Sequence, residues 1–391
     1  VGGYDASKAG DIQKLLIISE DSARVYVSKT PTKGHKGGFA VGGYDATKGG
    51  EDVDNFMSLT PNNYFIGHKS GINTAGLYNS YLGYETGIAT STVQKNVMIG
   101  YNSGKLSQNA SFNVFVGNET GFNNKGNYNT FMGYQSGLAN TDGMSNVFIG
   151  YTSGQNNTTG SNNVFLGVSC GTANSSGGNN VFVGSASGNN NTLGASNVFI
   201  GNYSGTRNKT GISNVFIGSE SGFNNDSGAN NVAVGNMAAH EGTAGVSNVM
   251  LGDSAGYSNT ASYNVMLGKG TGKVNTGNYN SFMGYQAGMK NQGGGSNVFI
   301  GNRSGFYNIS GNYNVFMGFE TGYRTTSDYN SFIGYKSGLI SNSYGNTFLG
   351  TFTGYLQTTG NHNTFIGSAA GYSNVSGSNN VFIGYSAGGN E

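Results

Sequence analysis

NVFIGYTSG, at residues 146–154, is one copy of a sequence motif that occurs twenty times in this chain. Each copy begins with asparagine and places a glycine four residues later, usually after an aromatic and an aliphatic residue. These anchor glycines, from Gly67 to Gly384, follow one another at intervals of 16 or 17 residues. An unbroken repeat of this kind predicts a stack of similar turns, a solenoid, and not an ordinary globular domain.

The repeat has two corners closed by glycine. After each anchor glycine comes x-x-small-Gly, and nineteen of the twenty copies keep the second glycine; Ala239 replaces it once. The residue two before the anchor glycine is Phe or Tyr in sixteen copies, and the exceptions are Met98, Ala233, Met250 and Met266. The variation in length falls in the polar stretch before the next asparagine, where a surface loop can absorb it.

The invariant asparagine predicts a ladder. Equivalent residues of neighbouring turns lie one strand spacing apart, so their side-chain amides can hydrogen-bond along the axis of the stack. The expected ladder includes Asn63, Asn146, Asn163, Asn180, Asn197, Asn214, Asn297 and Asn380. We therefore expect an all-β fold, a parallel β-solenoid or β-roll of about 20 coils with 16–17 residues per coil.

The strand sequence Val-Phe-Ile is apolar on both faces. Side chains alternate along a strand, so the aromatic residue lies on one face and the two aliphatic residues lie on the other. Such a strand has to be covered twice. A coil of about 17 residues covers one face with its own interior and is too thin to bury a second column. We expect another chain to supply the second cover, in a side-by-side homotrimer.

Residues 1–60 differ from the rest of the chain, because they hold 15 of its 37 charges. The motif VGGYDA occurs at residues 1–6 and again at 41–46, which predicts a longer repeat of about 40 residues. We interpret 1–60 as an N-terminal charged β repeat region and 61–391 as the solenoid. Pro61 is expected at the first edge of the solenoid, because proline cannot donate to a sheet ladder. Because the sequence starts within this motif, we expect it to be a fragment of a longer protein.

The composition disfavours several partners. A net charge of +1 provides no field to attract nucleic acid. No apolar run is long enough for membrane insertion, which takes about 18 residues or more. The single cysteine, Cys170, excludes an intrachain disulfide, and it stands where other repeats have Ser, Thr or Ala. We expect a buried small side chain there and not a reactive thiol.

Catalytic and metal-binding patterns are also missing from the sequence. No histidine has a metal-ligand spacing or joins a Ser-His-carboxylate arrangement; the histidines are His35, His68, His240 and His362. The aspartates of the repeats occupy isolated loop positions and read as turn residues: Asp142, Asp226, Asp253 and Asp328. The calcium-binding phrase Gly-Gly-x-Gly-x-Asp does not occur in the repeats. We expect no enzyme activity, no metal and no cofactor.

Aromatic residues outside the strand form two candidate rows. The first follows the anchor glycine and consists of Tyr84, Tyr101, Tyr134, Tyr151, Tyr285, Tyr335 and Tyr385. The second follows the other glycine and consists of Phe122, Phe223, Tyr257, Phe306, Tyr323, Tyr355 and Tyr372. Flat rings with wet hydroxyls suit contact with a glycan or another surface. The alternative, favoured by the regularity of the rows, is that the rings stack on one another and close the corners.

The repeat resembles a known family. NVFIG followed by x-x-Ser-Gly is similar to the Asn-Ser-Val-Ala-Ile-Gly repeats of trimeric autotransporter adhesin heads, over about residues 63–388. The resemblance implies a left-handed parallel β-roll, assembled as a trimer, that binds extracellular matrix or surfaces. KGGFAVGGYD at residues 36–45 resembles the segment that leads Gly/Asn-rich repeats in large surface and fibre proteins of gram-negative bacteria.

We therefore expect a non-enzymatic, extracellular structural fibre or adhesin of a bacterial cell surface. Its repetitive polar and tyrosine surface would serve attachment, for instance to a carbohydrate or a cell-surface ligand. The alternative is a receptor-binding tail or spike fibre of a phage or contractile injection particle. A polysaccharide-acting solenoid is less favoured because clustered acids are missing. An ice-binding solenoid is less favoured because only isolated threonine pairs occur, such as Thr158–Thr159.

Overall fold

The computed structural model describes residues 16–19, 22–25, 39–44, 53–89 and 92–389, and every regular element in these ranges is a β-strand. The first VGGYDA copy, at residues 1–6, lies outside the described ranges, and the second is described only as far as Tyr44. The chain forms two compact units, Val1–Ile149 and Gly150–Glu391. The division between them falls within the repeats, at an anchor glycine.

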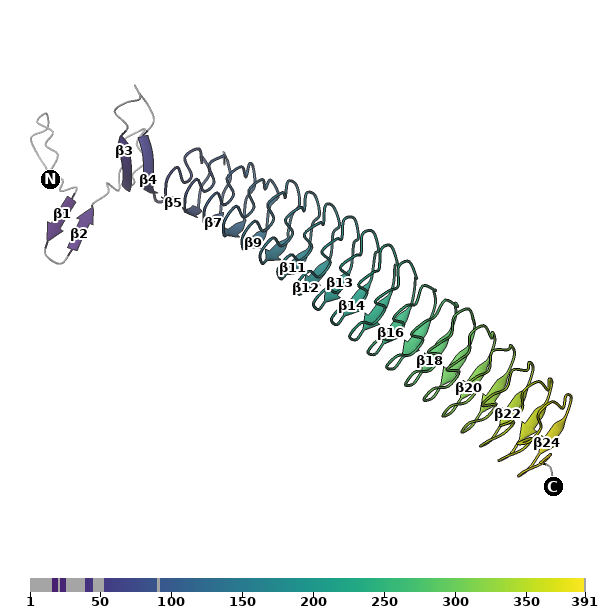
Figure 1. Cartoon of the computed structure of the whole chain (residues 1–391). Coiled ribbons are helices and arrows are strands. Elements are labelled where there is room, and N and C mark those ends of the chain that lie inside the picture. Colours follow the sequence, from purple (N-terminus) through teal and green to yellow (C-terminus); the bar gives the residue numbers. More distant parts are fainter. Residues whose placement is uncertain (1–15, 20–21, 26–38, 45–52, 90–91, 390–391) are drawn as a thin grey trace, which may run out of the picture. The chain divides into compact units, whose positions relative to one another are not determined.

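The first unit holds an antiparallel hairpin and a mixed sheet (Figure 1). The hairpin consists of β1 (Leu16–Ser19) and β2 (Ser22–Val25). The sheet consists of β3 (Phe39–Tyr44), β4 (Val53–Leu59), β5 (Asn63–Ile66), β6 (Asn79–Leu82), β7 (Val97–Ile99), β8 (Val114–Val116), β9 (Thr130–Met132) and β10 (Val147–Ile149). Pairing is antiparallel from β3 to β5 and parallel from β5 to β10.

The first strand of the solenoid is β5, and its outer edge is paired with the strand that precedes it in the sequence. β4 pairs with β5 in antiparallel register, with Leu59 opposite Tyr64. Pro61 lies in the short connection between these two strands. The prediction that Pro61 marks the first edge is therefore wrong, because β4 occupies that edge. A covered edge cannot pair with a strand of another molecule.

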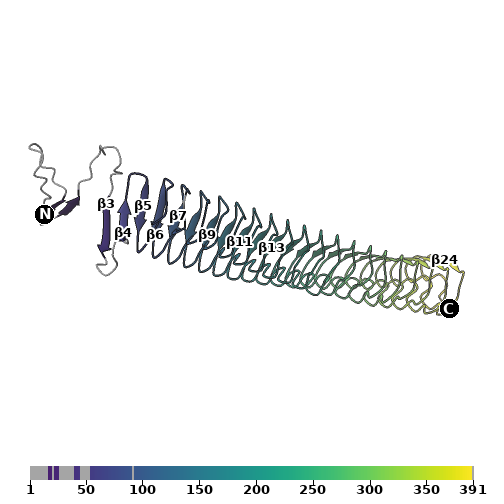
Figure 2. The ribbon, with the colours of Figure 1, turned by 90° about the horizontal axis from the view of Figure 1, so that it is seen from above.

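The second unit is a stack of parallel strands, one in each turn, and Figure 2 shows the same strands from above. They are β11 (Val164–Leu166), β12 (Val181–Val183), β13 (Val198–Ile200), β14 (Val215–Ile217), β15 (Val232–Val234), β16 (Val249–Leu251), β17 (Val265–Leu267), β18 (Ser281–Met283), β19 (Val298–Ile300), β20 (Val315–Met317), β21 (Ser331–Ile333), β22 (Thr347–Leu349), β23 (Thr364–Ile366) and β24 (Val381–Ile383). Neighbours pair in strict register, so that Phe182 lies opposite Phe199. The expected all-β parallel solenoid is confirmed, with about 19 turns.

Phenylalanines form the core of most turns. Phe199 is fully buried, and its ring stacks on that of Phe182 with centroids 4.8 Å apart and planes 2° apart. The opposite wall of the coil is glycine: a Cβ placed on Gly205 would lie 2.4 Å from the Phe199 ring. The interior is therefore one ring thick. The two aliphatic residues of the strand face outward, and Ile200 is 37% exposed.

The predicted asparagine ladder is present. The Asn197 amide oxygen accepts the backbone N–H of Asn214 at 2.9 Å, and its NH₂ group donates to the Gly211 carbonyl at 2.8 Å. The same two contacts are made by Asn63, Asn163, Asn180, Asn214 and Asn297. Asn146 and Asn380 donate their backbone N–H to the preceding ladder member. The ladder thus links side-chain amides to the main chain, and direct amide-to-amide contacts add to it in some turns.

Candidate functional site

The tyrosines predicted as surface contacts are all exposed, from 41% for Tyr134 to 84% for Tyr385; the others are Tyr84, Tyr101, Tyr151, Tyr285 and Tyr335. Neighbours stack where both turns carry a ring, as Tyr84 does on Tyr101 with centroids 5.4 Å apart. From Val168 to Lys269, none of the residues that directly follow an anchor glycine is aromatic. The rings therefore lie in short groups and do not form one continuous strip.

Rings of the second predicted row also stack in short groups. Tyr355 lies on Tyr372 with centroids 5.1 Å apart and planes 7° apart. Phe223 and Tyr257 stack on opposite faces of His240, at 5.1 and 5.0 Å. Such regular stacking agrees with the structural interpretation of this row, in which the rings close the corners.

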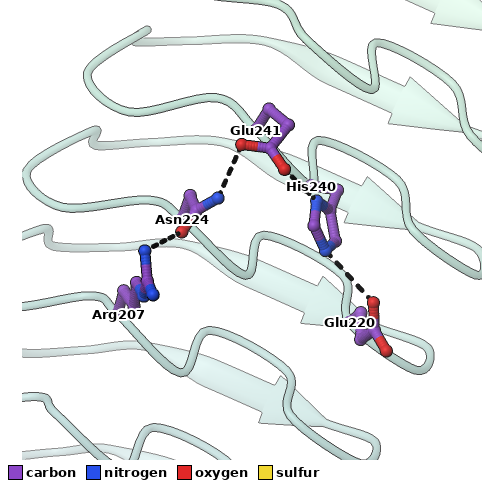
Figure 3. Close-up of polar contacts among 5 residues, drawn as sticks. All are labelled: Arg207, Glu220, Asn224, His240 and Glu241. Carbon is purple, nitrogen blue, oxygen red and sulfur yellow. Dashed lines mark hydrogen bonds and ion pairs between the residues drawn. The ribbon is translucent and has the colours of Figure 1, made fainter.

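His240 is also the centre of a polar network that joins three successive turns (Figure 3). Its Nδ1 lies 2.9 Å from the Glu241 carboxylate, and its Nε2 lies 3.1 Å from that of Glu220. Asn224 donates to Glu241 at 2.7 Å and accepts a hydrogen bond from Arg207 at 3.0 Å. The His240 side chain is only 13% exposed, so stacking and hydrogen bonding together fix the orientation of its ring.

The chemistry of this network favours linkage over catalysis. An imidazole that carries a proton on both nitrogens donates to both carboxylates at once. The five residues drawn in Figure 3 are two carboxylates, an imidazole, a guanidinium and an amide, and none of them is a hydroxyl or thiol that the histidine could activate as a nucleophile. What the network provides is a set of hydrogen bonds between residues 17 or 20 positions apart, which hold adjacent turns in register.

The network lies on a turn whose interior is incompletely filled. Ala233 replaces the core aromatic residue there, and Gly242 replaces a buried asparagine. A cavity of about 10 Å³ remains, and its walls include Phe216, Ala239 and Met250. Polar contacts outside the coil thus coincide with weak packing inside it, and we interpret the His240 network as a brace for this turn.

Other charged groups of the repeats are paired on the surface. Lys105 and Glu85 lie 2.6 Å apart, and this hydrogen bond raises the pKa of Lys105 above its usual value. Glu320 lies 3.6 Å from both Arg303 and Lys336. Ion pairs near the surface contribute little to stability, because solvent screens them. Within the described ranges, no group of three or more His, Cys, Asp or Glu side chains has the arrangement of a metal site.

Cys170 is buried, as the sequence predicted. Its Sγ is inaccessible to solvent and donates to the Phe182 carbonyl at 3.3 Å. Serines occupy the equivalent place in other turns, where Ser187 and Ser204 donate to the carbonyls of Phe199 and Phe216. Burial raises the pKa of the Cys170 thiol far above its usual value, because the thiolate would be desolvated.

Alkylation of Cys170 is expected to report unfolding. A thiol that is buried and protonated reacts only when its turn opens, so iodoacetamide at pH 8 should label the native protein about 1,000-fold more slowly than the unfolded chain. Mass spectrometry of intact protein over time measures both rates. A variant that combines Cys170→Ser with Ser185→Cys is the control, because residue 185 is exposed and should be labelled at once. Equal rates for the two cysteines would contradict the buried position.

The structure contains a second asparagine ladder that the sequence interpretation missed. Asn208 is buried, and its NH₂ group donates to the Asn191 amide oxygen at 2.8 Å and to the Gly211 carbonyl at 3.1 Å. This ladder stands three residues after the second glycine of each repeat. Asparagine occupies that place in twelve of the twenty copies, so the sequence did hold the signal. It was hidden by the many other asparagines of the polar stretch.

A third row of rings was also missed. It lies immediately before the ladder asparagine, and its tyrosines are between 50 and 62% exposed: Tyr78, Tyr128, Tyr263, Tyr279, Tyr313 and Tyr329. Tyr263 stacks on Tyr279, and Tyr313 stacks on Tyr329, each with centroids 5.1 Å apart. Every member has a φ near +60°, which is uncommon for a bulky residue. The repeated dipeptide Tyr-Asn was the sequence signal for this row.

Among the described residues there is no helix with the length and apolar character needed to cross a bilayer. No family model and no curated protein matches this chain.

Proposed function

We propose that this protein is a non-enzymatic structural fibre or adhesin that works outside the cell as a side-by-side homotrimer. The observation that carries this proposal is the outward face of the sheet. In β11–β24 the third residue of every strand is Ile, Leu, Val or Met, and no strand position is charged. The interior is already occupied, by phenylalanine in eleven of these fourteen strands, so this aliphatic stripe needs a cover from elsewhere.

The stripe is long enough to support stable association. Its side chains are about half-buried by their neighbours, as Leu251 and Ile333 are at 39% exposed. Burying the remainder contributes about 1 kcal/mol per side chain. Over fourteen strands this gain exceeds the cost of association, which is about 4–15 kcal/mol. A closed ring of three chains covers every stripe and leaves none free for open-ended assembly.

A structural role also agrees with the use of the polar residues. The first asparagine ladder and the buried serines bond to main-chain groups of neighbouring turns, and the second ladder links the side-chain amides of neighbouring turns. The carboxylates of Glu85, Glu220 and Glu320 pair with bases of adjacent turns. These polar contacts therefore stiffen the stack. A stack in which each turn is fixed to the next suits a protein that has to be long, rigid and resistant to proteases.

The solution mass of the protein tests the proposal. Sedimentation equilibrium of the full chain is expected to give three times the chain mass of 40.5 kDa. The double variant Ile200→Lys and Ile217→Lys places two charges per chain in the outward stripe and should dissociate the trimer. Both side chains face away from the core, so the turns themselves should remain folded.

The matched control carries the same charges elsewhere on the same turns. Leu193 and Ile212 are exposed aliphatic residues outside the strand, at 57 and 48%. The double variant Leu193→Lys and Ile212→Lys should therefore keep the trimer. A monomeric parent protein, or equal dissociation of both double variants, would refute assembly through the stripe.

A further inference from the structure

A depression of about 400 Å³ lies on the second unit beside the third row of rings. Tyr329 and Tyr344 form its aromatic walls, and Asn312, Asp328, Thr326 and Ser310 supply polar groups. A volume of this size falls in the range of small-molecule sites. The residues come from three successive turns, so the depression exists only in the stacked protein.

The sequence explains why the surface is hollow at this place. Two successive turns, from Gly318 to Gly334 and from Gly334 to Gly350, have 16 residues instead of 17, and the missing residue is in the polar loop. The position that holds Tyr313 and Tyr329 in two turns is Gly345 in the next. Gly345 therefore adds no side chain next to Tyr329 along the axis, and the ring of His362, from the following turn, lies against it, 2.9 Å from where a Cβ on Gly345 would be.

Tyr329 lines the depression, and only one face of its ring stacks on a neighbouring ring. Tyr313 covers that face, with centroids 5.1 Å apart and planes 5° apart. The Tyr329 side chain is 61% exposed, and Tyr344, which also lines the depression, is 48% exposed. Other turns place Ser196, Ser213 or Ser296 at this left-handed position, so the fold does not need a ring here. A bulky residue that accepts an uncommon φ without helping the core points to a function.

The polar groups suit a ligand rich in hydroxyls. Asp328 Oδ1 accepts hydrogen bonds from the backbone N–H and the side-chain NH₂ of Asn312, at 2.7 and 3.2 Å. Those bonds orient the carboxylate and leave its second oxygen to accept from a ligand. The hydroxyls of Ser310 and Thr326 donate to the protein and keep lone pairs for a ligand hydroxyl.

We propose that this depression, the Tyr329 site, binds a neutral hexose oligosaccharide. A pyranose has a C–H face that packs on an aromatic ring and a rim of hydroxyls that bind carboxylates and hydroxyls. The sugar ring stacks on the face of Tyr329 that is turned away from Tyr313, Tyr344 forms the side wall, and Asp328 accepts from two hydroxyls. The inference rests on the attachment function proposed above and names the ligand class and the residues.

Titration calorimetry with maltohexaose, cellohexaose and laminarihexaose tests the site in the full-length protein. At least one sugar is expected to bind the parent protein with a Kd between about 10 μM and 1 mM. Tyr329→Ser should weaken that binding about 10-fold or more, and Asp328→Asn about 3–10-fold. Both changes preserve the fold, because serine occupies the equivalent place at 296 and asparagine occupies it at 312. The side-chain oxygen of Asn312 accepts a backbone N–H just as that of Asp328 does.

The matched control is Tyr285→Asn, which removes an exposed tyrosine from the first row; asparagine fills that position at 302. It should leave binding unchanged. The inference fails if none of the three sugars binds the parent protein at 10 mM, or if the control weakens binding as much as Tyr329→Ser. Sedimentation of the same samples separates the two proposals. Intact trimers that bind no sugar refute the Tyr329 site alone, and monomers that bind sugar refute the assembly alone.

Discussion

Replacing Asn197 with leucine is expected to destabilise its pair of turns by about 3–6 kcal/mol. The leucine fills the space of the amide but makes none of its hydrogen bonds. The backbone N–H of Asn214 and the carbonyl of Gly211 lose their partners, and both bonds lie in the buried interior. Each unsatisfied buried group costs about 1–3 kcal/mol, and the lost contacts to Asn180 add to the total.

Hydrogen exchange of individual amides measures this effect where it arises. In a stack of repeats the stability is a sum of turns and of interfaces between neighbours, so one weak interface opens locally. The Asn214 amide should lose most of its protection, and turns several repeats away should keep theirs. The midpoint of guanidinium unfolding should fall as well.

The second ladder supplies the control. Thr325, Ser341 and Gln357 replace asparagine in it without breaking the stack, whereas the first ladder has no replacement in any of its twenty copies. Asn208→Thr should therefore cost about 1–2 kcal/mol, well below the cost of Asn197→Leu. Equal costs at the two positions would show that the invariance of the first ladder has a reason other than its hydrogen bonds.

The repeat made much of this fold predictable. Period, strand and first ladder follow from residues that recur at fixed places, such as Asn197 and Gly201. Alternation along Val-Phe-Ile predicted two apolar faces but did not say which one is inside. That choice depends on the glycine six residues later, because only a wall without side chains leaves room for the Phe199 ring beside Gly205.

The candidate sites were less predictable than the fold. The His240 network joins residues 17 or 20 positions apart, and none of them belongs to a motif. The Tyr329 site depends on a side chain that is missing at Gly345 and on two short turns, and each is ordinary alone. Such sites arise from departures from the repeat. An interpretation that relies on the regular features of the repeat does not find them.

One departure from the repeat, at Ala233 and Ala239, predicts that substitutions at these two positions compensate for each other. Ala233 is the only small residue at the core aromatic position, and Ala239 is the only residue that replaces the second glycine. The two stand six residues apart, as Phe199 and Gly205 do. A Cβ on Gly222 would lie 2.3 Å from the Phe216 ring in the preceding turn. Ala239 can therefore carry its Cβ because Ala233 has no ring.

Ala233→Phe alone is expected to destabilise the protein by about 1–3 kcal/mol. The new ring meets the Cβ of Ala239, and the adjoining cavity of about 10 Å³ is far too small to take it. Ala239→Gly alone should be nearly neutral. It relieves a residue held at φ +54°, worth about 1–2 kcal/mol, but it removes a buried methyl and adds freedom to the unfolded chain.

The double variant is expected to be more stable than the parent protein by about 2 kcal/mol, because it buries a phenylalanine in a continuous stack with Phe216. Guanidinium unfolding of all four proteins closes the cycle, with a coupling free energy of about 3–5 kcal/mol between the two sites. If Ala233→Phe stabilised the protein without the change at Ala239, the coil would have room for both groups, and the one-ring thickness of the interior would be wrong. If only the double variant is stabilised, the aromatic residue in the core requires a glycine at the corner, which explains why the two occur together in the repeat.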